Sequence, residues 1–433
     1  MSQKGEILMV RNRGEKEDFE KFSSPVINTN SNKDSQRHYY QSNSNMKDTS
    51  FKIIRLVLCL VVFVTGIVIG LISGSHIDVV DNWYINSRHS RHGVAAAPQN
   101  NIISSSHIIS NCTMVNKQPK IDCLSLEDLV HPKELIHGLS DQELFWRASM
   151  VPQIQGYPFK RVPKVAFMFL TRGPLPLLPL WERFFEGHED LFSIYVHTLP
   201  GFILNVSPYS VFFDRQIPSQ KVSWGDISLA DAEKRLFANA LLDFSNERFV
   251  LISESCIPVY NFQTVYKYLI ESVHSFVESY DDPSRYGRGR YSRRMGPNIR
   301  LHQWRKGSQW IEIKRALAIE IISDYKYYVL FRRYCHPSCY PDEHYIPTYF
   351  NIFHPYLNAN RTVTWVDWSL GGPHPASFGR ENITEGFIQN IRNNGTECWY
   401  NSLRTPICYL FARKFGPSAL EPLLNISSKV MGY

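Results

Sequence analysis

The chain has 433 residues, of which 43% are hydrophobic and 13% aromatic, so it can bury the core of one large or two ordinary domains. The formal net charge is +7, but 47 basic and 40 acidic residues are mixed along the chain, which excludes a polycation built to bind nucleic acid. The weak basic excess favours anionic ligands such as nucleotide sugars or acidic glycans.

The N-terminal part of the chain predicts a membrane anchor. Residues 1–50 are polar and aperiodic, which is typical of a disordered tail. Residues 51–74 contain an unbroken apolar run from Leu56 to Ile72, which with its flanks is long enough to span a bilayer. The long tail before it argues against a cleaved signal peptide, and its lack of polar residues argues against a buried core helix.

Charges and glycosylation motifs predict the orientation of this anchor. Basic residues, including Lys52 and Arg55, precede the apolar run, while Asp78 and Asp81 follow it, so the tail should be cytoplasmic and the rest luminal. The N-x-S/T motifs all follow the run, as expected of a glycosylated luminal domain. Their acceptors are Asn111, Asn205, Asn360, Asn382, Asn394 and Asn425.

Seven cysteines follow the apolar run, so an oxidising compartment would leave at least one of them unpaired. We expect Cys256, in an apolar context, to be the free thiol. Closely spaced cysteines suggest three disulfides: Cys112/Cys123, Cys335/Cys339 and Cys398/Cys408. A zinc site is the alternative for part of this set, although the spacing is not that of a familiar finger or ribbon. Its ligands would be Cys335, Cys339, His336 and His344.

Residues 75–150 are predicted to form a stem, with short helices near 125–129 and 141–147, and residues 151–433 to form the main folded domain. That domain opens with apolar runs of strand length that are continuous rather than alternating, which is typical of a parallel sheet buried on both faces. The runs are Lys164–Thr171, Leu191–His197 and Arg248–Ser253. Helical spacing of apolar residues between and after them predicts an α/β fold, with one helix beginning at Ser228.

Ligands of such sheets bind beyond the carboxyl ends of the strands. This rule predicts that Thr171, Arg172 and His197 line a ligand crevice, although they could equally be ordinary loop residues at strand ends.

The segment from Asp281 to Lys306 is rich in arginine. It is either a solvated loop or a basic lip over an anionic donor or acceptor. Its arginines are Arg285, Arg288, Arg290, Arg293, Arg294, Arg300 and Arg305.

An acid pair, Asp342 and Glu343, follows Pro341 within an aromatic stretch from Tyr334 to Phe350. Proline followed by acids is typical of the first turn of a helix. A carboxylate among aromatic rings is a candidate general base, whereas acids at a helix start also favour the macrodipole without any catalytic role.

Six motifs occur in one order along the luminal part: 164–171, 195–197, 253–258, 304–310, 339–345 and 411–415. Together they resemble the core-2/I-branching β-1,6-N-acetylglucosaminyltransferase family, most closely its plant brittle-culm-like branch. The resemblance implies a GT-A-like, Rossmann-type nucleotide-sugar-binding domain, a type II anchor in the Golgi membrane and inverting transfer from a UDP-sugar. It also implies that no divalent metal or other cofactor is used, and no Asp-x-Asp motif occurs in the luminal part.

The resemblance implies that Glu343 is the catalytic base and that Asp342 merely accompanies it at the helix start. It also implies that basic residues near the C-terminus meet the charge of the departing UDP, with Lys414 first and Arg404 and Arg413 after it. Tryptophans could stack on acceptor sugars or serve as core aromatics. They are Trp310, Trp365 and Trp368.

The chain departs from the animal members after its second predicted strand, where Thr198 and Leu199 stand in place of an acid that contacts the donor nucleotide. A plant-type enzyme could therefore use another UDP-sugar and a cell-wall or arabinogalactan acceptor. The alternative is a non-catalytic luminal protein that binds glycans or acts as a scaffold. A hydrolase would need a second carboxylate facing Glu343, and no spacing supports Glu254 in that role.

Overall fold

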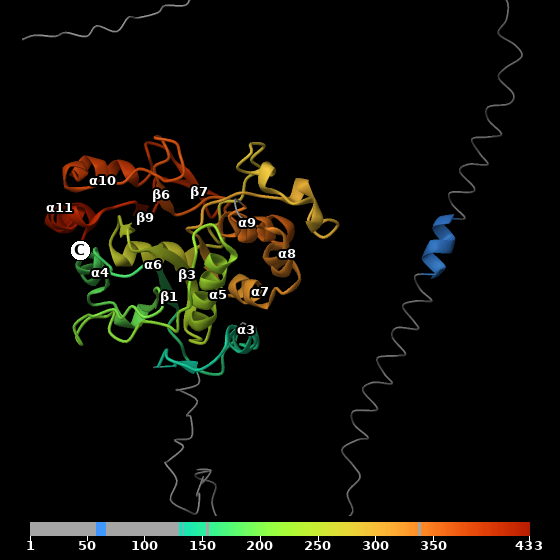
Figure 1. Cartoon of the computed structure of the whole chain (residues 1–433), viewed down its shortest axis with the longest axis horizontal. Helices are drawn as coiled ribbons and strands as arrows, with labels where there is room; N and C mark the ends of the chain where they lie inside the picture. The colour runs from blue at the N-terminus through green and yellow to red at the C-terminus, as the bar shows by residue number, and fades with distance from the viewer. Residues whose placement is uncertain (1–57, 66–129, 133, 153–155, 337–338) are drawn as a thin grey trace, which may run out of the picture. The chain divides into compact units, whose positions relative to one another are not determined.

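The computed structural model describes residues 58–65, 130–132, 134–152, 156–336 and 339–433 (Figure 1). It divides into two units, Met1–Ser110 and Asn111–Tyr433. In the first unit residues 58–65 are helical, and they lie inside the predicted anchor. Within the described ranges, no helix is both long enough and apolar enough to cross a bilayer. The predicted tail, Asn111 and the pair Cys112/Cys123 lie outside the described residues.

The second unit is built on a four-stranded sheet of order β2-β1-β3-β5. The strands are β1 (Lys164–Leu170), β2 (Phe192–His197), β3 (Asn246–Ser253) and β5 (Glu312–Lys314). β1 lies parallel to β2 and to β3, whereas β5 is antiparallel to β3. Six of the seven residues of β1 are buried, which confirms the prediction drawn from its continuous apolar run.

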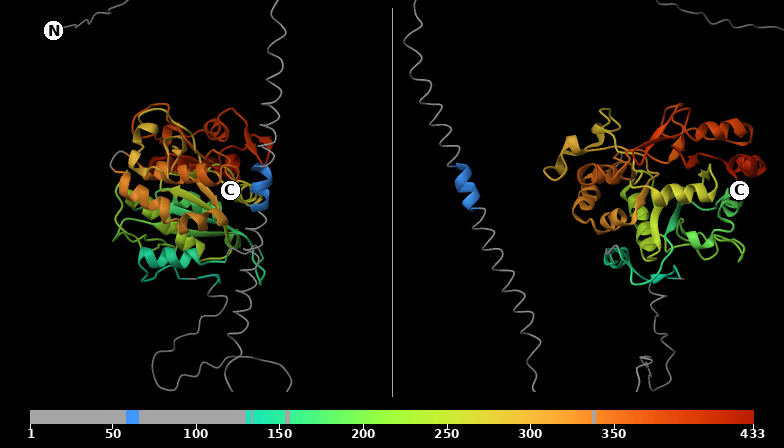
Figure 2. Two further views of the ribbon diagram at one scale, coloured as in Figure 1. Left: turned by 90° about the vertical axis from the view of Figure 1, so that its right-hand side faces the viewer. Right: turned by 180° about the vertical axis from the view of Figure 1, so that it is seen from behind.

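Alternate residues of β1 serve two separate cores. Ala166 and Met168 face a core shared with the helices α3, α5, α7 and α9, while Phe167 and Phe169 face a core shared with α4, α6 and the C-terminal helices. The views in Figure 2 show helices on both faces of this sheet. The helix bounds are α3 (Asp141–Ser149), α4 (Leu178–Phe185), α5 (Ile227–Leu241), α6 (Phe262–Glu271), α7 (Arg315–Ser323), α8 (Lys326–Tyr334), α9 (Pro341–Phe353), α10 (Glu385–Ile391) and α11 (Leu420–Ile426).

Two helices differ from the sequence expectation. α5 begins at Ile227, one residue before the predicted Ser228, because the Asp226 side chain caps it by accepting a hydrogen bond from the Ser228 amide. α3 was assigned to the stem, but its Leu144 and Ala148 are buried against α5 and α7, so the packed unit includes it. Ser140 and Glu143 form the capping box that starts this helix.

Smaller elements complete the unit. A second sheet has the order β4-β9-β6, and a hairpin pairs β7 with β8. Their bounds are β4 (Ile257–Pro258), β6 (Thr364–Val366), β7 (Cys398–Tyr400), β8 (Leu403–Thr405) and β9 (Phe411–Arg413). Short turns of helix are η1 (Glu189–Leu191), η2 (Arg288–Arg290), η3 (Arg293–Met295), η4 (Leu301–Gln303), η5 (Arg380–Asn382), η6 (Pro417–Ala419) and η7 (Ser427–Met431).

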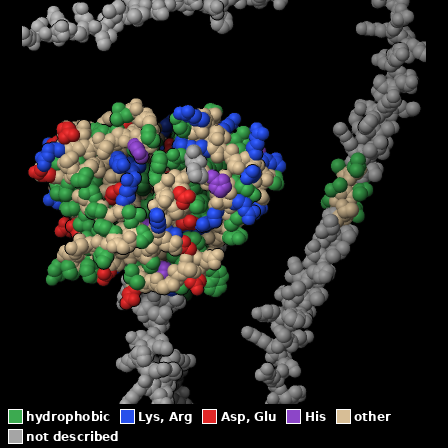
Figure 3. Space-filling view, in the orientation of Figure 1, with side chains coloured by type: hydrophobic (Ala, Val, Ile, Leu, Met, Phe, Trp, Pro, Cys, Tyr) green, Lys and Arg blue, Asp and Glu red, His purple; other side chains and the backbone are tan. Residues whose placement is uncertain are grey.

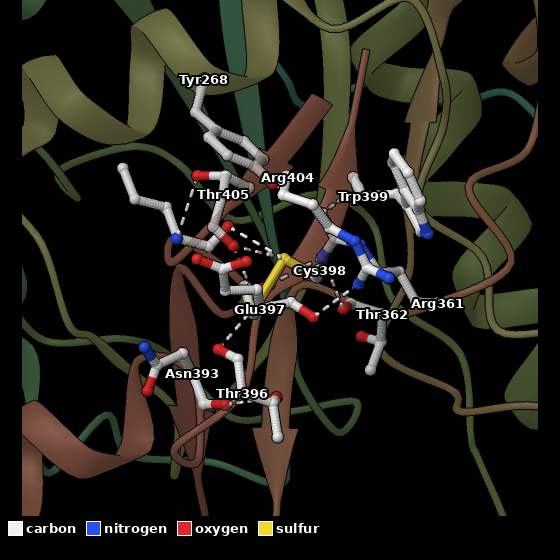
Figure 4. Close-up of a disulfide and its surroundings, with 12 residues drawn as sticks. Tyr268, Arg361, Thr362, Asn393, Thr396, Glu397, Cys398, Trp399, Arg404 and Thr405 are labelled. Carbon is white, nitrogen blue, oxygen red and sulfur yellow. Dashed lines mark hydrogen bonds between the residues drawn. A yellow bond between two sulfur atoms is a disulfide. The ribbon is translucent and has the colours of Figure 1, made fainter. Parts of the chain in front are cut away.

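Two of the expected disulfides are present, Cys335–Cys339 and Cys398–Cys408. The first joins two of the proposed zinc ligands, so the zinc alternative is wrong. Figure 4 shows the second beside the β7–β8 hairpin. Cys256 is a buried free thiol, as predicted.

Candidate active site

The carboxylate of Glu343 lies in the first turn of α9. Tyr340 precedes this helix in a left-handed conformation with φ 56°, and Pro341 occupies the first helical position, where its missing N–H costs nothing. The helix start predicted from the sequence is therefore confirmed. The Glu343 side chain is 24% exposed, so a ligand can reach it.

Two cations hold that carboxylate. Arg290 Nη1 donates to Glu343 Oε2 at 2.7 Å, and Lys306 Nζ donates to the same oxygen at 2.6 Å. Burial by itself would raise the pKa of Glu343, but Lys306 and Arg290 outweigh burial and lower the pKa below its usual range. Glu343 is therefore ionised at neutral pH and able to accept a proton.

The neighbouring acid has a different environment. Asp342 is buried, and its Oδ1 has no hydrogen-bond partner within the described part of the chain. Burial, followed by the charge of Glu343, raises the pKa of Asp342 to about 7. Glu233 of α5, which accepts from Gln309 Nε2 at 2.9 Å, has a pKa raised by burial and by Asp342. Asp342 therefore lies in the first turn of α9, as predicted, and it is also a buried carboxyl that interacts electrostatically with Glu233.

His344 is held as a neutral ring beneath the site. Its Nδ1 lies 2.7 Å from the carbonyl oxygen of Arg305, which assigns the ring proton to Nδ1. The ring stacks on Trp304 with centroids 4.6 Å apart, and burial lowers the pKa of His344 to about 4. This histidine therefore supports the loop that carries Lys306.

A second group of cations gathers at the carboxyl end of β1. Arg172 follows β1, while Arg413 and Lys414 stand at the end of β9. Burial lowers the pKa of Lys414, and the positive charges of Arg413 and Arg172 lower it further, which places the three side chains in one electrostatic neighbourhood. Glu254 is the acid that acts on both Arg413 and Lys414. Cations that repel one another beside a single acid are suited to bind an anion.

One short segment connects the two groups. Lys306 binds Glu343, and four residues later the Trp310 ring lies 4.2 Å from the Arg413 guanidinium carbon. The Gly307 amide also donates to the Glu343 carbonyl oxygen at 2.9 Å. Residues 306–310 therefore link the base to the cation group at the end of β9.

The other predicted site residues lie elsewhere or are engaged. Thr171 is buried and donates to the Gly173 carbonyl oxygen at 3.2 Å. His197 is 1% exposed, its Nε2 lies 3.3 Å from Arg235 Nη1, and burial lowers its pKa to about 4, so its side chain faces α5. Arg404 stacks on Trp399 at 4.3 Å in the β7–β8 hairpin (Figure 4).

The three tryptophans have different environments. Trp310 is 7% exposed and packs beneath Arg413, so it supports the cation group from the core. Trp365 packs against Phe378 and Phe387, with ring centroids 5.7 and 6.2 Å away. Trp368 is 51% exposed and keeps a free ring for a ligand.

Sequence reasoning missed an aromatic rim beside the base. The Tyr340 ring lies 4.1 Å from the Arg290 guanidinium carbon and 5.0 Å from the ring of Trp224, which is 56% exposed. Gly225 has φ +74°, and a Cβ there would come within 2.9 Å of the Tyr340 ring. A Trp-Gly pair in a loop before a capped helix is the signal that could have pointed to this rim.

The described glycosylation acceptors are all exposed: Asn205, Asn360, Asn382, Asn394 and Asn425. Asn360 and Asn382 accept backbone hydrogen bonds through their amide oxygens. Within the ranges that the structure covers, no group of three or more His, Cys, Asp or Glu side chains is placed to hold a metal ion.

An α/β sheet with a cation after its first strand, two more at the end of β9 and an ionised carboxylate at the start of α9 is suited to glycosyl transfer from a nucleotide sugar. The family model described as Branch: Core-2/I-Branching enzyme matches residues 165–392. The chain is 35% identical over 310 residues to Glycosyltransferase BC10 of Oryza sativa subsp. japonica, covering 61% of this chain and 76% of that relative. The chain belongs to the core-2/I-branching enzyme family, and it is a glycosyltransferase.

Proposed function

We propose that this glycosyltransferase transfers a sugar from a UDP-sugar, with inversion at the anomeric carbon, to a hydroxyl of a glycan or glycoprotein in the Golgi lumen. The observation that carries this proposal is the Glu343 carboxylate, held ionised by Arg290 and Lys306 and joined through residues 306–310 to the cations at the strand ends. Golgi residence rests separately on the charges that flank the apolar run and on the one-sided glycosylation motifs.

The proposed reaction is a single in-line displacement. The acceptor oxygen forms a bond to the anomeric carbon as the bond from that carbon to the diphosphate oxygen breaks, and the electron pair leaves with UDP. The acceptor proton passes to Glu343, since a hydroxyl is too weak a nucleophile without a base. Both cations bind Glu343 Oε2, and we assign the acceptor hydroxyl to the other carboxylate oxygen, Oε1.

The negative charge that develops on the departing UDP must be stabilised by positive groups around the diphosphate. Arg172, Arg413 and Lys414 supply fixed positive charge there, and we assign them to the diphosphate. This assignment supports transfer without a divalent metal ion. Two exposed rings, Trp224 of the rim and Trp368, are the aromatic surfaces that we assign to the acceptor sugar.

The test uses the full-length chain with a panel of UDP-sugars, in the presence and absence of EDTA. We expect slow donor hydrolysis or transfer with at least one UDP-sugar, unchanged by EDTA. Glu343→Gln should reduce transfer by about a hundredfold or more, because it removes the base, while UDP still raises the melting temperature.

Glu186→Gln is the matched control, since Glu186 is exposed and removed from these contacts. It should leave turnover unchanged. Full turnover by Glu343→Gln would refute the assignment of the base. A chain that folds normally but shows neither turnover nor stabilisation by UDP would instead be the glycan-binding or scaffold protein.

A further inference from the structure

A strongly basic surface lies beside the proposed base. Residues 283–306 contain eight Lys or Arg and no Asp or Glu. They form the turns η2, η3 and η4, and η3 packs against α8, whose last turn adds Arg332 and Arg333. Figure 3 shows Lys and Arg side chains gathered over this face.

Several of these cations are already engaged. Arg288 pairs with Asp281, Arg290 and Lys306 pair with Glu343, and Arg305 donates to carbonyl oxygens of its own loop.

Three arginines in the same loop are exposed and remain available. Arg293, Arg294 and Arg300 have no side-chain hydrogen bond or ion pair among the described residues. We call these three the patch arginines. The loop conformation does not use their charge, which leaves it available to a ligand.

The patch arginines are continuous with the site. η2 carries Arg290, which binds Glu343, and η3 carries Arg293 and Arg294 only three and four residues later. The Tyr286 ring, half exposed, lies beside Arg290, whose guanidinium carbon is 5.7 Å from the ring centre. A ligand on this face can therefore contact cations, an aromatic ring and the base.

We propose that the acceptor is an acidic glycan, whose carboxylates bind the patch arginines while one of its hydroxyls reaches Glu343. This inference rests on the proposed function and names its acceptor class. Guanidinium groups bind carboxylates through two parallel hydrogen bonds, and exposed aromatic rings bind sugar faces. An anionic lipid surface has complementary charge, but a bilayer on this face would close off Glu343, whereas a uronic acid chain supplies the hydroxyl that the base requires.

The test measures binding of short oligogalacturonates and oligoglucuronates to the full-length chain. The matched ligands are their methyl esters, which keep the sugar chain and remove the charge. The patch variant is Arg293→Gln, Arg294→Gln and Arg300→Gln. We expect its Kd for the acidic glycan to be about tenfold weaker than that of the wild type, because three surface contacts are lost. Added salt should reduce this difference.

The control variant removes three exposed cations elsewhere: Arg147→Gln, Lys160→Gln and Lys267→Gln. It should bind like the wild type. Equal affinity in the patch variant, equal loss in the control variant, or equal binding of the methyl esters would each overturn the proposal. Patch-dependent binding to phosphatidylserine vesicles without binding to either oligouronate would also overturn it, in favour of a membrane surface.

The temperature shift caused by UDP separates this proposal from the proposed function. It should be the same in the wild type and the patch variant, because the diphosphate cations are untouched. A chain that responds to UDP but does not bind acidic glycans would lose this acceptor assignment and keep the transferase assignment.

Discussion

The two cation groups of the site carry similar charge in opposite electrostatic settings. Arg290 and Lys306 converge on one carboxylate oxygen of Glu343, which offsets part of their charge. Arg172, Arg413 and Lys414 repel one another and have Glu254 as their neighbouring acid. The difference indicates that the first group tunes a protein carboxylate, whereas the second is left with charge to offer a ligand.

The largest effect should come from the second group, Arg172, Arg413 and Lys414. Lys414→Met keeps the length of the side chain and removes its charge. We expect kcat/KM for the UDP-sugar to fall about a hundredfold, because a fixed cation no longer stabilises the departing diphosphate. The stabilisation by UDP in thermal unfolding should shrink as well.

Lys414→Arg is the control for that change, since it restores the charge. It should recover part of the UDP response. If Lys414→Met were stabilised by UDP as strongly as the wild type, the second group would not be the diphosphate site. The proposed difference in role between the two cation groups would then be wrong.

A smaller and pH-dependent effect should come from the group that binds Glu343. Lys306→Met removes one of the two cations that lower the pKa of Glu343, so the pKa should rise. A base works only when ionised, and activity is lost as the pH falls through its pKa. The acid limb of the kcat/KM profile should therefore move to higher pH, with a loss of up to about tenfold near pH 5.

The activity of Lys306→Met near pH 8 separates an effect on the pKa of Glu343 from an effect on substrate position. Glu343 is ionised there with or without Lys306, so the loss should be smaller than near pH 5. A loss of equal size at both values would mean that Lys306 positions the substrate instead of tuning Glu343. Lys326→Met, at an exposed position in the first turn of α8, should leave the profile unchanged.

Patterns that depend on one stretch of chain were readable from the sequence. The continuous apolar run of β1 predicted a strand buried on both faces, and the Pro-Asp-Glu order predicted the start of α9. The grouping of Arg172 with Arg413 and Lys414 followed from the rule on strand ends together with the family motif. These signals are local, or they come from a general property of parallel sheets.

Features that arise from packing between distant elements were not readable. The turn of His197 toward α5 depends on Arg235, which lies 38 residues away, and the placement of Trp310 beneath Arg413 depends on β9. Burial of Asp342 opposite Glu233 depends on how α9 packs on α5. Periodicity says that such residues lie on a helix, but it does not say which neighbour a given side chain meets.

That buried pair gives the smallest expected effect. The folded-state pKa of Asp342 is raised to about 7 by burial and by Glu343, against about 3.9 for an unfolded chain. Its ionisation therefore costs stability: the cost is absent below about pH 4 and grows as the pH rises toward 7. Asp342→Asn keeps the shape and cannot ionise. It should raise the Tm by about 3 °C near pH 8 and leave it unchanged near pH 4.

Asp190→Asn is the matched control, because Asp190 is exposed in η1 and should show no such dependence. Activity of Asp342→Asn near pH 7 should stay close to that of the wild type, since Glu343 keeps both of its cations. An equal Tm gain at both pH values would contradict this explanation, because the gain would then not come from the ionisation of Asp342. A large loss of activity without a change in Tm would instead indicate that Asp342 contacts the acceptor. The charge around Glu343 would then depend on Asp342 as well as on Arg290 and Lys306.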